Sequence, residues 1–81
     1  MRGNFDMTYP VIDVKATAVK IKALRLARGL TVREVQQFLA LQEPQAVYKW
    51  ERGCNLPSLD NLLALSLLLK ASVEEILVYH N

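Results

Sequence analysis

The chain has 81 residues, of which 52% are apolar, and a formal net charge of +2. A chain of this length forms one small domain that is stable only with a well-packed core, and a single cysteine excludes an internal disulfide framework. One cysteine and one histidine without metal-ligand spacing exclude a tetrahedral zinc site, and no apolar run is long enough to span a bilayer.

The first 14 residues lack a helical pattern, and Pro10 interrupts any regular start. The stretch TYPVIDV alternates weakly between apolar and polar residues, which is compatible with an extended arm and equally with an unstructured leader. The N-terminal MRGNFDMTYP has no apolar segment typical of a signal peptide, so we expect a soluble, cytoplasmic protein. We assign residues 1–14 to an N-terminal arm and residues 15–81 to one domain.

Two helices are predicted over residues 16–28 and 31–39. The first contains good helix formers, and Gly29 follows at the position of a C-terminal stop. Thr31 and Glu34 have the spacing of a capping box at the start of the second helix. The buried face of that second helix is predicted to carry Val35, Phe38 and Leu39.

A third helix is predicted over residues 44–52, in the stretch PQAVYKWERG. Pro44 is tolerated in the first turn, where its missing N–H has no partner, and Gly53 follows as the stop signal. Val47 and Trp50 are three residues apart and point inward, so Trp50 is interpreted as a core residue rather than a base-stacking one. The outward face carries Gln45, Tyr48 and Lys49.

Two more helices are predicted after the linker that contains Cys54. Ser58 is a suitable N-cap for a helix over residues 59–70, and Ser72 with Glu75 forms a second capping box. The helix over 59–70 carries two leucine stripes, so it is buried on two sides or shared with a partner chain. The stripes are Leu62, Leu65, Leu69 and Leu59, Leu63, Leu67. The last helix is predicted to bury Val73, Ile76 and Leu77, and His80 is assigned to a frayed tail.

The sequence therefore predicts an all-α fold of five short helices, without a strand in the domain. The second and third helices are joined by a short connection, which is the arrangement of a helix-turn-helix motif. Residues 1–52 carry nine Lys/Arg and five Asp/Glu, whereas residues 53–81 carry one and three. This asymmetry indicates a polyanionic partner, although charge alone favours the simpler interpretation of a solvated helical face.

Four motifs together resemble the lambda-repressor-like (Cro/repressor) helix-turn-helix family. They are GLTVREVQQFL, PQAVYKWERG, LPSLDNLLALSLLL and SVEEIL, and the resemblance covers about residues 17–78. It implies a compact five-helix domain that binds double-stranded DNA, with the third helix in the major groove. We therefore expect a prokaryotic transcriptional regulator, most often a repressor, that binds a two-half-site operator as a homodimer.

The resemblance also implies roles for matching positions. Gln45 and Lys49 match positions that contact base edges, with Tyr48 and Glu43 flanking them. The positions that match contacts with the DNA backbone in this family are Thr31, Arg33, Pro44 and Arg52. Arg25 and Glu51 match a largely buried ion pair that ties the first helix to the third. The chain departs from the family in three places. Val32 replaces a usual Gln, Ala40 stands where the turn usually has Gly, and Gln42-Glu43-Pro44 occupies the place of the usual Ser or Thr cap.

The alternative is a protein-interaction module on the same fold, an antitoxin-like or anti-repressor partner that uses the leucine-rich C-terminal helices. The acidic C-terminal part and the modest net charge support it. An enzyme is not expected, because Cys54 has no plausible base partner and no phosphate-binding or dinucleotide fingerprint is present. No cofactor or small-molecule ligand is predicted.

Overall fold

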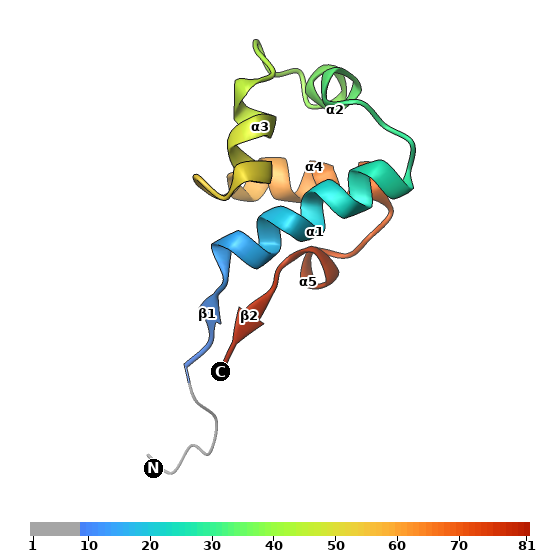
Figure 1. The fold of residues 1–81 in the computed structure, drawn as a ribbon. Coiled ribbons are helices and arrows are strands. Elements are labelled where there is room, and N and C mark those ends of the chain that lie inside the picture. Colours follow the sequence, from blue (N-terminus) through green and yellow to red (C-terminus); the bar gives the residue numbers. More distant parts are fainter. Residues whose placement is uncertain (1–8) are drawn as a thin grey trace.

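The computed structural model describes residues 9–81, which contain five helices and one pair of very short strands (Figure 1). The all-α fold with five helices is thereby confirmed. Residues 1–8, part of the expected N-terminal arm, lie outside the described residues. Within the described chain no helix has the length and apolar character needed to cross a membrane. The elements are β1 Val11–Ile12, α1 Val14–Ala27, α2 Val32–Phe38, α3 Gln45–Arg52, α4 Leu59–Leu69, α5 Val73–Ile76 and β2 Tyr79–His80.

Three of the helices, α2, α4 and α5, begin where the predicted capping residues lie. The Thr31 hydroxyl accepts a hydrogen bond from the Glu34 amide at 3.1 Å, and the Glu34 carboxylate accepts one from the Thr31 amide at 2.8 Å. Ser72 and Glu75 form the same reciprocal pair, at 3.0 and 2.7 Å. The Ser58 hydroxyl caps α4 with a single bond at 3.2 Å. These bonds satisfy amides that lack a partner in the first turn of each helix.

The core lies between α1 and α4, with residues from all five helices. α1 packs against α3 and α5, and α2 packs against α3 and α4. Trp50 is 5% exposed, which confirms it as a core residue. Burial of these apolar side chains is the main stabilising contribution in a domain of this size. The buried cluster is Ile21, Val32, Val35, Val47, Trp50, Leu62, Leu65, Leu69 and Ile76.

The predicted burial of Phe38 is wrong, because its side chain is 54% exposed. The buried stripe of α2 is formed by Val32 and Val35, with Leu39 packed against the core just after the helix. With about 3.6 residues per turn, including Val32 in the stripe moves its centre away from Phe38. The same burial gives Val32 a core role at the position where the family usually has Gln.

The expectation that the domain contains no strand is also wrong. β1 and β2 pair antiparallel, with Val11 opposite His80 and Ile12 opposite Tyr79. The contact continues into α1, where the fully buried Thr17 hydroxyl accepts a hydrogen bond from the Val78 amide at 3.0 Å. The C-terminal segment is therefore fastened to the start of α1 rather than frayed.

Asp13 joins this strand pair to α1. Its carboxylate accepts a hydrogen bond from the Ala16 amide at 2.9 Å, so α1 begins at Val14, two residues earlier than predicted. The other carboxylate oxygen lies 2.8 Å from His80 Nε2. The Ala16 amide and, secondarily, His80 lower the pKa of Asp13 below its ordinary value. Both interactions favour the ionised carboxylate.

Candidate nucleic-acid interface

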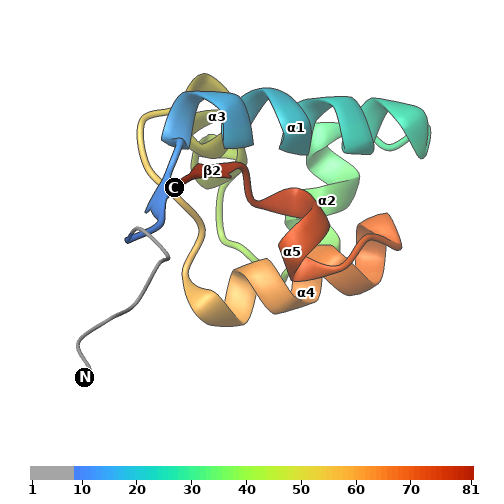
Figure 2. The same ribbon diagram turned by 90° about the horizontal axis from the view of Figure 1, so that it is seen from below.

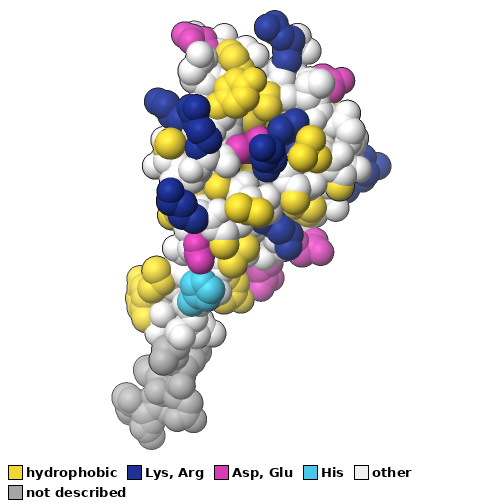
Figure 3. All heavy atoms as spheres, in the orientation of Figure 1, with side chains coloured by type: hydrophobic (Ala, Val, Ile, Leu, Met, Phe, Trp, Pro, Cys, Tyr) yellow, Lys and Arg dark blue, Asp and Glu magenta, His cyan; other side chains and the backbone are white. Residues whose placement is uncertain are grey.

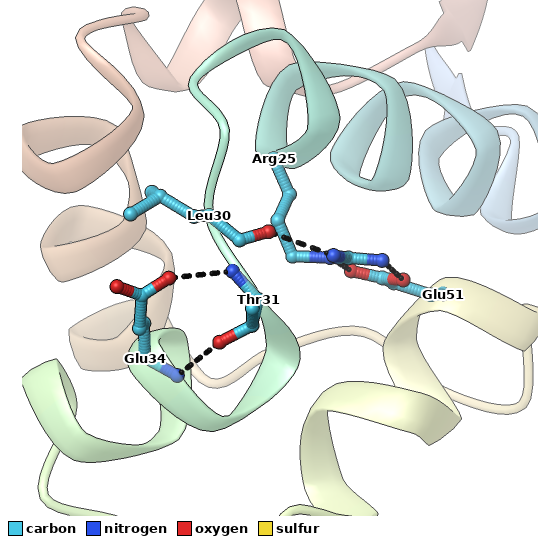
Figure 4. A network of polar contacts seen from close by, with 5 residues as sticks. All are labelled: Arg25, Leu30, Thr31, Glu34 and Glu51. Atoms are coloured by element: carbon cyan, nitrogen blue, oxygen red, sulfur yellow. Dashed lines mark hydrogen bonds and ion pairs between the residues drawn. The ribbon is translucent and has the colours of Figure 1, made fainter.

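Arg25 on α1 and Glu51 on α3, expected as an ion pair, are in direct contact (Figure 4). Arg25 Nε lies 2.7 Å from Glu51 Oε2, and Nη2 lies 3.0 Å from Oε1. Arg25 Nη1 donates a further hydrogen bond to the Leu30 carbonyl at 2.9 Å. The two side chains are only 11% and 6% exposed. A two-point contact of this kind fixes orientation as well as distance, so it holds α3 at a defined angle to α1.

The pKa of Arg25 is raised above its ordinary value, chiefly by the hydrogen bonds to Glu51 and against the effect of burial. The guanidinium therefore stays charged, and its charge is neutralised locally by Glu51. It is an architectural group, because its donors are directed into the protein and not toward solvent (Figure 4).

The outward face of α3 presents three polar side chains together. Gln45, Tyr48 and Lys49 are exposed, while Val47 and Trp50 on the opposite face are buried. Since residues one turn apart share a helix face, the amide, phenol and ammonium groups form one surface. The rigid core behind them supports that surface.

The start of α3 is less strongly capped than the other helices. Pro44 occupies the N-cap position and makes no side-chain hydrogen bond, and Glu43 before it is exposed. In the α2–α3 connection, Gln36 Nε2 donates to the Leu41 carbonyl at 3.2 Å. Ala40 adopts φ 55°, a left-handed conformation that favours glycine. The expected glycine position therefore has the backbone geometry that glycine would supply.

The N-terminus of α2 presents the exposed Thr31 and Arg33. The Thr31 hydroxyl oxygen accepts a hydrogen bond within the capping box, which leaves its proton available to an outside acceptor. Arg52 is exposed at the other end of α3, immediately before Gly53. The structure thus places donors and positive charge at both ends of the α3 surface.

Lys15 was missed by the sequence analysis. A Cβ atom added at Gly53 would lie 3.1 Å from Lys15 Cδ, so the Lys15 side chain runs beside the end of α3. No local sequence signal predicts this contact, because α1 and α3 meet only in the folded chain. Within residues 9–81, Arg25 is the only Lys or Arg that forms an ion pair, so Lys15, Lys49 and Arg52 remain available to an external anion.

Figure 3 shows Lys and Arg side chains distributed over the face of the domain that carries α1 and α3. Apolar side chains lie between them, and the basic groups do not form one continuous patch. Among residues 9–81 there is no cluster of His, Cys, Asp or Glu suited to a metal ion. Exposed basic side chains spread over one face attract an anionic partner.

Comparison with known proteins identifies the family. A family model described as helix-turn-helix matches residues 21–76, from within α1 to the end of α5. The chain belongs to the helix-turn-helix family of the Cro/repressor type. In this family α2 and α3 are the two helices of the motif, and the α3 surface described above lies on its second helix. A comparison with curated protein sequences gave no match.

Solved helix-turn-helix structures have the same fold. The restriction-modification controller protein C.AhdI from Aeromonas hydrophila has a TM-score of 0.71 and 28% identity, covering 79% of this chain and 96% of its own. The clp gene regulator ClgR from Corynebacterium glutamicum has a TM-score of 0.70 and 26% identity, and the match covers 76% of this chain and 65% of ClgR. The DNA-binding domain of BldD from S. venezulae has a TM-score of 0.67 and 24% identity, and the match covers 80% of this chain and 96% of that domain. At this identity the likeness shows the fold alone.

Proposed function

We propose that this helix-turn-helix protein regulates transcription by binding specific sequences in double-stranded DNA, with α3 in the major groove. The observation that carries the proposal is the outward face of α3, where Gln45, Tyr48 and Lys49 lie together on a helix fixed from behind. The major groove admits an α-helix and displays a distinct donor and acceptor pattern for each base pair. The similarity to a controller protein and a gene regulator supports the same role.

The side chains at this surface suit different parts of the duplex. Gln45 has an amide that pairs with adenine N6 and N7, and Lys49 donates to guanine O6 or N7. Each such contact is worth roughly 1–3 kcal/mol of discrimination against the wrong base. Tyr48 and Glu43 flank these two, and Glu43 is suited to accept from cytosine N4.

We assign the contacts with the DNA phosphate backbone to residues at the ends of α2 and α3. Thr31, Arg33, Pro44 and Arg52 lie at the start of α2 and at both ends of α3. Contacts to phosphate set the register of the protein on the duplex without specifying the sequence. Lys15 adds a fifth position beside the end of α3.

One domain of this size contacts only a short stretch of groove, so we propose that it acts as a homodimer. Two copies then occupy half-sites about 34–36 Å apart on one face of the duplex. Occupancy of such an operator blocks access to the promoter, and repression is therefore the proposed outcome. This assignment requires no cofactor.

The test is fluorescence anisotropy with labelled mixed-sequence duplex DNA at several salt concentrations. We expect the logarithm of the association constant to fall with the logarithm of salt concentration, by about 0.9 for each phosphate contact. Lack of binding at low salt by a folded, helical protein would contradict the proposal.

A second experiment assigns the contacting surface. An operator is selected from a random duplex library, and the Gln45→Ala/Lys49→Ala variant is compared with Lys20→Ala. Lys20 is exposed and lies on the side of α1 that faces α5, where the pKa of Glu75 is lowered chiefly by hydrogen bonds from Ser72 and to a smaller extent by Lys20. We expect the α3 variant to lose discrimination between operator and random DNA and the control to keep it. Equal discrimination in both variants would exclude α3 as the base-contacting helix.

A second candidate function is a protein-interaction module on the same fold. The observation that favours it is the exposed leucine stripe on α4, formed by Leu59, Leu63 and Leu67. If substitutions in this stripe abolished regulation while DNA binding and folding were unchanged, the interaction module would be the better assignment.

A further inference from the structure

α4 has two leucine stripes, and the fold buries only one of them. Leu62, Leu65 and Leu69 are 5%, 1% and 2% exposed. Leu59, Leu63 and Leu67 are 83%, 58% and 70% exposed. Of the two sequence-based interpretations, burial on both sides is therefore wrong for the single chain. Contiguous exposed apolar surface of this kind marks an interaction site on a monomer.

The exposed leucine stripe lies at the outer edge of the domain. Figure 2 shows α4 on the side opposite α1, with α2 and α5 between them. The outer side of α4 is not covered by any other element of the described chain. Leu56, in the segment before α4, is also 36% exposed. A partner helix can therefore approach along the whole length of α4.

We propose that a second copy of this chain covers the exposed leucine stripe, with the two α4 helices antiparallel around a two-fold axis at Leu63. The inference rests on the proposed function, which requires two copies for two half-sites. Leu59 and Leu67 lie four residues before and after Leu63, so each is about 6 Å from it along the helix. An antiparallel two-fold arrangement brings Leu63 against its own copy and Leu59 against Leu67 of the second copy. A two-fold interface brings the same patch of both copies together with reciprocal contacts, and this stripe meets that condition.

The charges at the ends of α4 support the antiparallel direction. Asp60 lies in the first turn, and Lys70 is the C-cap residue. With the two-fold axis at Leu63, Asp60 of each copy lies at the level of Ser66 of the other, and Lys70 follows one turn, about 6 Å, further along, within reach of its long side chain. In a parallel pair, Asp60 would face Asp60 and Lys70 would face Lys70, which is repulsive. The exposed leucine stripe itself carries no charge, so no ionised group is buried at the centre of the contact.

The primary test is sedimentation equilibrium of the full chain and of two matched variants. Leu63→Glu introduces a charge at the centre of the exposed leucine stripe, and Leu26→Glu introduces the same charge on α1. Both leucines are 58% exposed, so the two substitutions have similar consequences for the isolated fold. We expect wild type and Leu26→Glu to dimerise and Leu63→Glu to weaken the dimer by roughly 30-fold or more, the scale of a central interface residue.

Leu63→Ala serves as a milder variant if Leu63→Glu alters the helical circular dichroism spectrum. We expect it to weaken dimerisation in the same direction, by about tenfold. A wild-type chain that remains monomeric at its solubility limit overturns the proposal. So does a Leu63 variant that is folded and dimerises as tightly as wild type.

The direction of α4 pairing is tested with charge reversals. Asp60→Lys places two like charges at each end of an antiparallel interface and is expected to weaken the dimer, as is Lys70→Asp. The double variant Asp60→Lys/Lys70→Asp restores opposite charges and is expected to recover most of the affinity. If the double variant is no better than the worse single variant, the antiparallel arrangement is excluded.

DNA binding separates this proposal from the function on which it rests. A monomeric Leu63→Glu protein is expected to bind a single half-site as wild type does and to lose the added affinity for two half-sites. If neither protein binds DNA but wild type dimerises through the stripe, the DNA function fails and the dimer remains. If wild type binds DNA but Leu63→Glu still dimerises, the proposed interface fails.

Discussion

Replacing Arg25 with methionine is expected to destabilise the domain by about 3–5 kcal/mol, the usual cost of leaving one member of a buried ion pair unpaired. Methionine keeps most of the side-chain volume, so the loss is mainly electrostatic. It removes the two charge-assisted bonds to Glu51, at 2.7 and 3.0 Å, and the bond to the Leu30 carbonyl at 2.9 Å. The Glu51 carboxylate, 6% exposed, is then left without its counter-charge.

This loss is large for so small a domain. At about 0.05–0.15 kcal/mol per residue, 81 residues give a total stability of roughly 4–12 kcal/mol. A domain of this size loses about 4–8 °C of Tm for each kcal/mol, so the expected shift is about 12–40 °C. Lys22→Ala, an exposed position on the same helix, is the control and should stay within about 0.5 kcal/mol of wild type.

Urea unfolding followed by circular dichroism measures these differences, with the Arg25→Met/Glu51→Leu variant completing a double-mutant cycle. The double variant leaves no unpaired charge, so it is expected to be more stable than Arg25→Met alone. If the free energy of unfolding of Arg25→Met lies within about 0.5 kcal/mol of the wild-type value, the ion pair does not contribute significantly to holding α3 in place. If the stability loss of the double variant equals the sum of the losses of Arg25→Met and Glu51→Leu measured singly, the two groups are energetically independent despite their contact.

Four further outcomes follow from backbone geometry and charge. Ala40→Gly is expected to raise the stability slightly, by about 0.5 kcal/mol, because relief of the left-handed strain exceeds the entropy cost of glycine; calorimetry measures it. Gly53→Ala should cost more than Gly29→Ala, since both have positive φ but an added Cβ meets Lys15 only at Gly53; equal costs would show that the Lys15 side chain moves freely away. Asp13, whose pKa is lowered in the fold, stabilises the folded state when ionised. The stability difference between wild type and Asp13→Ala is therefore expected near neutral pH and should narrow as pH falls below about 4, as followed by thermal melts. Lys15→Ala should reduce the salt slope of DNA binding by about 1 without changing base preference, measured by anisotropy.

The parts of the fold that were predictable depend on signals within a few residues of one another. Three such signals are confirmed: the capping boxes at Thr31 and Ser72 and the helix C-terminus at Gly53. Each depends on contacts inside one helical turn. The inward position of Trp50 also follows from helical spacing. Such signals do not depend on the rest of the chain, so the sequence alone is enough to place them.

The features that were missed depend on contacts between distant residues. The pairing of Val11 with His80 has no local signal, because two-residue strands lack a measurable alternation. Lys15 becomes part of the candidate site only when α1 meets the end of α3. The base and phosphate contacts of the α3 surface remain predictions, since they depend on a duplex as well as on the fold.

The strand pair β1–β2 determines where the described chain enters and leaves the domain. Both strands lie side by side at one end, whereas the α2–α3 connection lies at the other (Figure 1). A fluorescent protein or affinity tag joined after β2 therefore emerges beside β1, away from the α2–α3 connection. Deleting residues 78–81 would instead remove the hydrogen-bond partner of the buried Thr17 hydroxyl. The C-terminal end is thus an unsuitable place for trimming.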